Sequence, residues 1–238
     1  MAVVDHVVAT QSQFAAVLAT GDIAQDASPE AYAFYDTQVS RLQAPIHYLP
    51  GNHDELVRLN AIAASQVTPV QFTLGQWQII MLNSAVHHEI YGQLNAENLQ
   101  FLSDTLASVS EQTFVLICLH HHPIPCGANW LDDHNLKNSA EFWARVEPYP
   151  QVRGVVWGHI HQEFAASHRR SSVLNLPNIA CFATPSTCIQ FKPQVQEFAL
   201  DNVNCGYRLF ELYPDGRLVS EVVRIKTTFR VDMQSQGY

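Results

Sequence analysis

The chain has 238 residues, of which 47% are hydrophobic and 15% are charged. This composition is typical of a single folded domain and excludes a disordered chain. Acidic residues outnumber basic ones by 22 to 13, so the net charge of −9 argues against a broad surface for nucleic-acid polymers or anionic membranes. The five cysteines form no C-x-x-C pair, which suits a reducing cytoplasm better than a disulfide framework.

Helical and strand patterns alternate along the first fifth of the chain. Valines at helical spacing predict a helix that begins at Met1, and the short apolar run 14–20 predicts a buried strand. Ser28 as N-cap and Pro29 at the first helical position predict a second helix. Residues 45–49 predict the next strand, so the region has the strand–helix–strand order of an α/β protein.

The remaining elements add hairpins to this alternating pattern. Residues 70–82 predict a hairpin around a Gly-Gln turn, and Asn95 is a suitable cap for a following helix. Two apolar runs, 114–119 and 152–157, predict buried strands, and 207–225 predicts a second hairpin. We therefore expect one α/β domain over residues 1–238, with two packed mixed sheets flanked by helices.

Four of the predicted strands each lead into a cluster of polar residues. Because the carboxyl ends of strands share one edge of an α/β sheet, we expect these clusters to converge. Carboxylate oxygen, amide oxygen and imidazole nitrogen together suit Mn, Fe or Zn. Each cluster alone could be a turn or a helix cap, but all four together predict a metal site. The clusters are Gly21-Asp22-Ile23-Ala24-Gln25-Asp26, Gly51-Asn52-His53-Asp54, His120-His121-His122-Pro123 and Gly158-His159-Ile160-His161.

The order of these motifs resembles that of the calcineurin-like metallophosphoesterase family. Further segments resemble its bacterial cyclic AMP phosphodiesterase branch, namely Trp130-Leu131-Asp132, Ala183-Thr184-Pro185-Ser186-Thr187-Cys188 and Gly206-Tyr207-Arg208. The resemblance implies a two-sheet α/β sandwich that hydrolyses a phosphodiester, with 3′,5′-cyclic AMP, a small anionic nucleotide, as the favoured substrate. It also implies two divalent metal ions (Mn, Fe or Zn) that bind the phosphate and acidify a water molecule.

The resemblance also implies a role for each matching residue. Asp22 would bridge the two metals, with Asn52, His121 and His159 completing one site and His161 belonging to the other. His121 is chosen because it fits His-x-Pro, and His120 and His122 are the alternatives. His53 would contact the phosphate or the leaving group, so that Asp22 and His53 are the expected catalytic residues and Asn52 and His53 the expected substrate contacts. Asp26 and Asp54 are expected to orient the loops.

One departure from the family pattern concerns the first strand, where the family carries Asp-x-His as two further metal ligands. Nothing before Asp22 matches that motif, and the pair Asp132 and His134 has the spacing but the wrong place in the chain order. We therefore expect a domain that lacks its N-terminal segment and holds one metal ion tightly. Two other hypotheses stay open: hydrolysis of another phosphodiester or phosphomonoester, and a metal-binding protein without activity.

Overall fold

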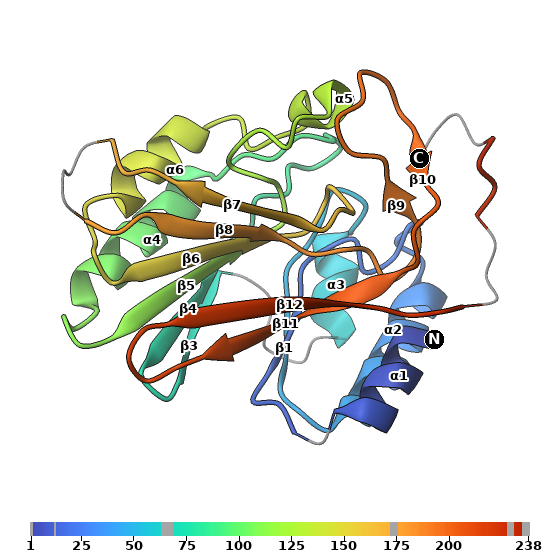
Figure 1. Ribbon diagram of the computed structural model, residues 1–238, viewed down its shortest axis with the longest axis horizontal. Helices are drawn as coiled ribbons and strands as arrows, with labels where there is room; N and C mark the ends of the chain where they lie inside the picture. The colour runs from blue at the N-terminus through green and yellow to red at the C-terminus, as the bar shows by residue number, and fades with distance from the viewer. Residues whose placement is uncertain (1, 12, 63–68, 172–175, 228–230, 235–238) are drawn as a thin grey trace.

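A six-stranded mixed sheet forms the centre of the fold in the computed structural model, which describes residues 2–11, 13–62, 69–171, 176–227 and 231–234 (Figure 1). Its inner strands β4, β5, β6 and β8 are parallel, and the outer strands β3 and β7 are antiparallel to their neighbours. In spatial order the strands are β3 (Val70–Leu74), β4 (Trp77–Met81), β5 (Phe114–Leu119), β6 (Val152–Trp157), β8 (Ile179–Ala183) and β7 (Phe164–His168).

Two helices cover one face of this sheet, α4 (Ala96–Ser108) and α6 (Ser139–Val146). Leu102 of α4 and Phe142 of α6 are fully buried and belong to the same apolar cluster as Ile117 of β5. Asn95 caps α4 as the sequence predicts, since its side chain accepts a hydrogen bond from the Asn98 amide. Burial of these side chains against the sheet holds the first half of the sandwich together.

The opposite face of the sheet packs against two separate pairs of strands. β1 (Val17–Ala19) pairs with β2 (Ile46–Tyr48) in parallel, and β11 (Gly206–Leu212) pairs with β12 (Leu218–Arg224) in antiparallel fashion. Leu18 of β1 and Phe210 of β11 both contact the apolar cluster that contains Leu116 of the large sheet. The expected fold of two packed sheets is confirmed, with the smaller layer divided into two pieces.

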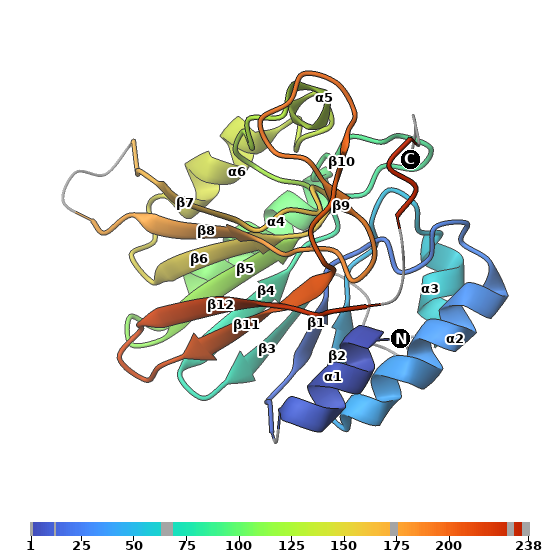
Figure 2. The same cartoon turned by 45° about the vertical axis from the view of Figure 1, so that its right-hand side comes forward.

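Further helices lie outside this smaller layer (Figure 2). They are α1 (Ala2–Thr10), α2 (Pro29–Val39) and α3 (Leu56–Ile62), while the short elements η1 (Ser40–Leu42), α5 (Asn129–Asp132), β9 (Gln190–Phe191) and β10 (Leu200–Asp201) connect the main ones. None of the described helices is long and apolar enough to cross a membrane.

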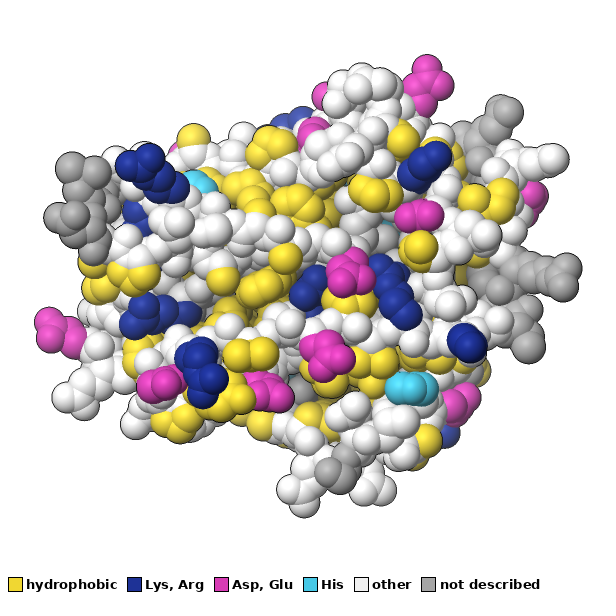
Figure 3. Space-filling model, in the orientation of Figure 1, with side chains coloured by type: hydrophobic (Ala, Val, Ile, Leu, Met, Phe, Trp, Pro, Cys, Tyr) yellow, Lys and Arg dark blue, Asp and Glu magenta, His cyan; other side chains and the backbone are white. Residues whose placement is uncertain are grey.

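Most of the predicted elements are confirmed, with shorter ends. The strand predicted over 14–20 is reduced to Val17–Ala19 because only these three residues pair with β2. Ser28 and Pro29 start α2 as predicted. The outward face of the β11–β12 hairpin carries side chains of both charges (Figure 3), which fits the alternation of exposed and partly buried residues along β12.

Two hairpin glycines allow backbone strain and steric conflict to be measured separately. Gly75 and Gly216 both have positive φ (58° and 82°), but only a Cβ atom on Gly216 would collide, 2.4 Å from the Phe114 ring. We expect Gly75→Ala to lower the free energy of unfolding by about 1 kcal/mol, which is the strain of alanine at positive φ. Gly216→Ala should lose about 2–4 kcal/mol because overpacking is added. Urea unfolding measures both, and equal losses would contradict this packing of the hairpin against β5.

Candidate metal centre

The four polar clusters meet at one end of the two layers of strands. Asp22 follows β1, Asn52 follows β2, His120 follows β5 and His159 follows β6. Asp22 Oδ2 and Asn52 Oδ1 each lie 3.3 Å from His120 Nε2. The ring nitrogens of His120, His121 and His159 offer ligand atoms that lie within 4.8 Å of one another. Residues up to 137 positions apart in the chain thus form one compact polar cluster.

His120 is the histidine of the His120–His122 run that faces both the carboxylate and the amide. Its Nδ1 lies 2.7 Å from the carbonyl oxygen of Thr20 and can only donate to it, so a neutral ring carries its lone pair on Nε2. That lone pair faces two further acceptors, Asp22 Oδ2 and Asn52 Oδ1. Three acceptors that face one another repel unless a cation, either a proton or a metal ion, lies between them.

His121, the histidine chosen from the His-x-Pro pattern, uses both ring nitrogens within the protein. Its Nδ1 lies 2.9 Å from Ser84 Oγ, and its Nε2 lies 3.1 Å from the carbonyl oxygen of Ile90. The ring is fully buried. The geometry therefore favours His120, one of the two alternatives that the sequence left open, as the residue directed at Asp22.

Charge and burial together set the protonation of the cluster. Burial alone would raise the pKa of Asp22, but the charge of a protonated His120, its hydrogen bond to the carboxylate and the hydrogen bond from the His53 amide outweigh burial and hold that pKa well below its usual range. Burial opposes the charged form of His120, yet the charge of Asp22 raises its pKa. Burial keeps the pKa of His159 well below the usual value and lowers that of His161 to about 4. Neutral imidazoles at pH 7 are the form that binds metals.

The backbone is strained at three of the expected ligands. Asp22, His159 and His161 have φ angles of 53°, 56° and 49°, which non-glycine residues seldom adopt. Such strain costs about 1–3 kcal/mol per residue and persists where the surrounding structure fixes it, often at functional sites. Close packing around Gly51 is one such restraint, because a Cβ atom there would lie 2.0 Å from Asp22 Oδ1.

Asp54 ties the Asp22 loop to the Asn52 loop. Its carboxylate accepts hydrogen bonds from the backbone amides of Ile23 (3.0 Å), Ala24 (3.2 Å) and Gly51 (2.8 Å), and from the hydroxyl of Tyr32 (3.0 Å). Its oxygens are therefore directed at backbone amides in both loops. The expectation that Asp54 orients the loops is confirmed by these contacts.

Asp26 has a similar local role. It accepts a hydrogen bond from the amide of Ser28 just before α2, where it is exposed to solvent.

His53 and His161 complete the rim of the cluster. The backbone amide of His53 donates to Asp22 Oδ1 at 3.1 Å, and its ring Nδ1 lies 3.2 Å from Gln25 Nε2. A Gln25 amide that donates here leaves the proton of a neutral His53 ring on Nε2, the atom left for contact with a substrate. The ring of His161 stacks on Phe191 with the ring centroids 4.3 Å apart. The sequence assigned no role to either partner: Gln25 lies within the first polar cluster, and Phe191 lies outside all four clusters.

A second polar group lies behind the cluster, at the turn before α5. Asp132 accepts hydrogen bonds from the amides of Cys126 and Gly127, and its Oδ1 lies 3.2 Å from His122 Nε2. These contacts close the turn. Trp130 packs against Phe191 and Phe198.

The described residues fit a divalent cation. The cluster offers carboxylate and amide oxygens with imidazole nitrogens, a donor set that suits Mn, Fe or Zn. Within the described part of the chain, Asp22 Oδ2 and His159 Nε2 are buried without a hydrogen-bond partner. Buried polar atoms are normally paired, and a bound ion would give Asp22 Oδ2 and the His120 lone pair a common partner. A site for divalent metal is therefore a property of this cluster.

Comparison with known proteins agrees with this geometry. Residues 1–163 match the family described as calcineurin-like phosphoesterase. The 3′,5′-cyclic adenosine monophosphate phosphodiesterase CpdA of Vibrio vulnificus is 39% identical over all of this chain and 85% of its own length. That of Escherichia coli K12 is 38% identical over all of this chain and 84% of its own length.

Solved structures with this fold are more distant in sequence. A dimetal phosphatase from Danio rerio superposes with a TM-score of 0.64 at 15% identity, over 94% of this chain and 87% of its own. Purple acid phosphatase from yellow lupin gives 0.61 at 14% identity, over 93% of this chain and 48% of its own. These two likenesses show the fold alone. The family match and the CpdA identities go further, and together with the cluster they show that this chain belongs to the calcineurin-like phosphoesterase family.

Proposed function

We propose that this chain hydrolyses 3′,5′-cyclic AMP to AMP with the help of divalent metal ions. The observation that carries the proposal is the meeting of Asp22, Asn52, His120 and His159 at the ends of four strands. The choice of substrate is supported by the printed names of relatives at 38–39% identity that span the whole chain. Because the net charge of the chain is −9, local positive charge at the site, such as that of a metal ion, would favour the approach of an anionic substrate.

The proposed ligands fall into two groups that share the Asp22 carboxylate. Asn52, His120 and His159 would hold one ion with Asp22, and His161 would contribute to a second. His120 takes the place first given to His121, because His120 Nε2 faces Asp22 and Asn52 while His121 is engaged by Ser84 and Ile90. Carboxylate, amide oxygen and imidazole ligands suit Mn, Fe or Zn.

Bound divalent ions polarise phosphate oxygens and lower the pKa of water. The residues of this chain hold the ligand loops in position and supply a proton donor. Asp54 holds the Asp22 and Asn52 loops in register, and the Thr20 carbonyl fixes the tautomer of His120. His53, with its proton on Nε2, is placed to donate a hydrogen bond or a proton to the departing 3′-oxygen. Burial lowers the pKa values of His159 and His161, which keeps both imidazoles neutral and able to act as ligands.

The function is tested by incubating the chain with cyclic AMP and Mn²⁺ and measuring AMP by chromatography, beside cyclic GMP, bis-p-nitrophenyl phosphate and p-nitrophenyl phosphate. We expect cyclic AMP to be converted fastest and a chelator to stop the reaction. Asp22→Asn should lose bound metal and at least about 100-fold in rate, because both groups of ligands share this carboxylate. Asp26→Asn is the matched control and should keep both. Faster hydrolysis of p-nitrophenyl phosphate than of cyclic AMP would contradict the proposal and indicate a phosphatase. If none of the substrates is hydrolysed, the alternative hypothesis of a metal-binding protein without activity is supported.

Metal titration of two alanine variants shows which of His120 and His121 is the metal ligand. His120→Ala should bind Mn²⁺ more than about 100-fold more weakly in calorimetry, a loss at or above that for outer partners of metal ligands. His121→Ala should bind within about 10-fold of the parent. The free energy of unfolding of His121→Ala should fall by about 1–3 kcal/mol, because Ser84 and the Ile90 carbonyl lose their hydrogen-bond partner. The reverse pattern of affinities would restore His121 as the ligand.

His53 is expected to act in turnover and not in metal binding. His53→Ala should keep its metal content in elemental analysis and lose about 10²–10⁴-fold in kcat for cyclic AMP, the usual contribution of a general acid. The control is His88→Ala, which replaces an exposed histidine and should change neither value. A metal loss in His53→Ala equal to that in Asn52→Ala would show that the two roles are reversed.

A further inference from the structure

A group of metal-ligating side chains lies next to the candidate metal centre but outside it. The group consists of His122, which directly follows the His120–His121 pair, Cys126 in the turn that comes next, and Asp132 at the end of α5. One ligand atom from each of these three residues lies within 4.8 Å of the other two. Within the described part of the chain, this is the only such group that contains a cysteine.

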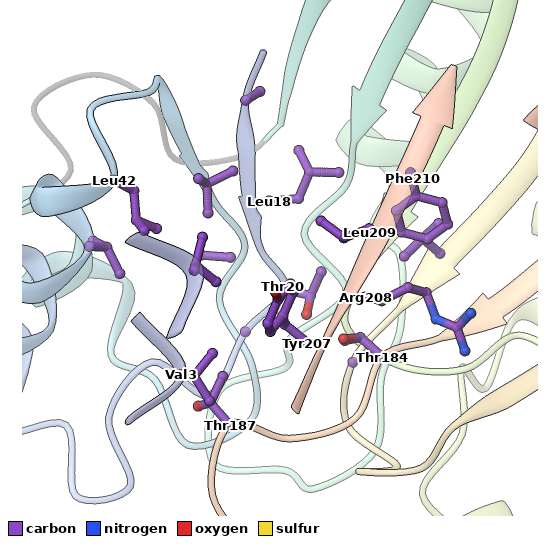
Figure 4. A pocket seen from close by; sticks show the side chains of 18 of the residues that line it. Val3, Leu18, Thr20, Leu42, Thr184, Thr187, Tyr207, Arg208, Leu209 and Phe210 are labelled. Atoms are coloured by element: carbon purple, nitrogen blue, oxygen red, sulfur yellow. The ribbon is translucent and has the colours of Figure 1, made fainter. Parts of the chain in front are cut away.

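This group shares no ligand with the candidate metal centre. The pocket that reaches the metal centre is lined by Thr20 and Thr184 (Figure 4) and also by His120 and His159, but by no residue of the group. The two sites are neighbours, since the rings of His122 and His159 have their centroids 5.9 Å apart. An ion held by the group would therefore be an additional ion, with its own ligands and surroundings.

The spacing of His122 and Asp132 fits two ligands of one ion. His122 Nε2 lies 3.2 Å from Asp132 Oδ1. Zinc holds imidazole nitrogen and carboxylate oxygen at about 2.0–2.2 Å, so two ligands at tetrahedral angles lie roughly 3.3–3.5 Å apart. The observed distance is close to this value, and an ion between the two atoms would replace the proton that they otherwise share.

The turn before α5 holds the carboxylate of Asp132 in place before any ion binds. Its Oδ1 accepts a hydrogen bond from the Cys126 amide at 2.7 Å, and its Oδ2 accepts one from the Gly127 amide at 3.0 Å. Gly127 has a φ of 86°, a conformation that favours glycine and allows the backbone to turn sharply here. Carboxylates that bind metals are usually oriented by such outer hydrogen bonds.

Burial separates the group from solvent on most sides. His122 is fully buried and Cys126 is 8% exposed, whereas the side chain of Asp132 is 22% exposed and leaves a route for an ion and a water molecule. Ala128 and Leu131 belong to the same apolar cluster as Cys126. Burial raises the pKa of the Cys126 thiol to about 12, so the metal-free thiol is not a nucleophile at neutral pH.

We propose that His122, Cys126 and Asp132 form a further metal site, the thiolate site, which binds Zn²⁺ through an imidazole nitrogen, a thiolate and a carboxylate oxygen. Water takes the fourth tetrahedral position. On binding, the His122 ring stays neutral and the Cys126 thiol loses its proton to solvent, because thiolate is the form that ligates metals. The sulfur ligand selects Zn²⁺ over Mn²⁺, which prefers oxygen ligands.

Cobalt titration of the chelator-treated full chain tests the thiolate ligand, because a sulfur-to-cobalt charge-transfer band in the near ultraviolet requires a bound thiolate. We expect Co²⁺ to produce this band and Zn²⁺ to abolish it by displacing cobalt, whereas excess Mn²⁺ should leave it. Cys126→Ser should lose the band and bind Zn²⁺ at this site at least about 100-fold more weakly, a loss at or above that for outer partners of metal ligands.

Two further variants serve as controls for this titration. Cys188→Ser replaces an exposed cysteine outside the group and should keep both the band and the zinc affinity. Asp22→Asn removes a ligand of the candidate metal centre and should also keep the band, because the thiolate site does not use that carboxylate.

A measurement on the parent chain decides the question if Cys126→Ser does not fold. X-ray absorption at the zinc edge should show a sulfur ligand at about 2.3 Å. A spectrum without sulfur, a parent chain without the cobalt band, or a band that persists in folded Cys126→Ser would each overturn the proposal. Loss of the band in Cys188→Ser would overturn it as well, by placing the thiolate ligand elsewhere. These readouts report sulfur ligation, so the thiolate site stands or fails independently of whether the chain hydrolyses cyclic AMP.

Discussion

The burial of one carboxylate, that of Asp22, is the constraint on which the site depends. Its side chain is only 7% exposed, and a buried charge is costly unless it is paired and hydrogen-bonded. The His53 amide donates a hydrogen bond to Oδ1, whereas Oδ2 faces the lone pair of a neutral His120 ring. A divalent cation resolves that conflict, so the same arrangement that is unfavourable for an isolated carboxylate is favourable for a metal site.

The two layers of strands are braced against each other around this carboxylate. Asp54 joins the loops that follow β1 and β2, while the Gly158 amide donates to the His120 carbonyl and joins the loops that follow β5 and β6. The His120 ring then bonds to the Thr20 carbonyl and connects the large sheet to the smaller layer. Strain at Asp22, His159 and His161 is sustained because these bonds leave the loops little freedom to relax.

Local patterns in the sequence predict most of the elements and the meeting of the four clusters. The apolar runs 114–119 and 152–157 match β5 and β6 residue for residue, because buried parallel strands leave an unambiguous apolar signal. The choice within His120–His122 could not be made, since it depends on which ring is directed at Asp22 from a different sheet. Ser84 and Gln25 were missed for the same reason: each gains its role through a contact more than 25 residues away in the chain.

The central claim is that a divalent ion lies against Asp22 and His120. Anomalous X-ray scattering from crystals of the chain soaked in Mn²⁺ tests it most directly. The account predicts a peak in direct contact with Asp22 Oδ2 and His120 Nε2, with His159 completing the site and His121 still bonded to Ser84. A peak confined to His122, Cys126 and Asp132, the other group of described side chains close enough together to hold a metal ion, would contradict it.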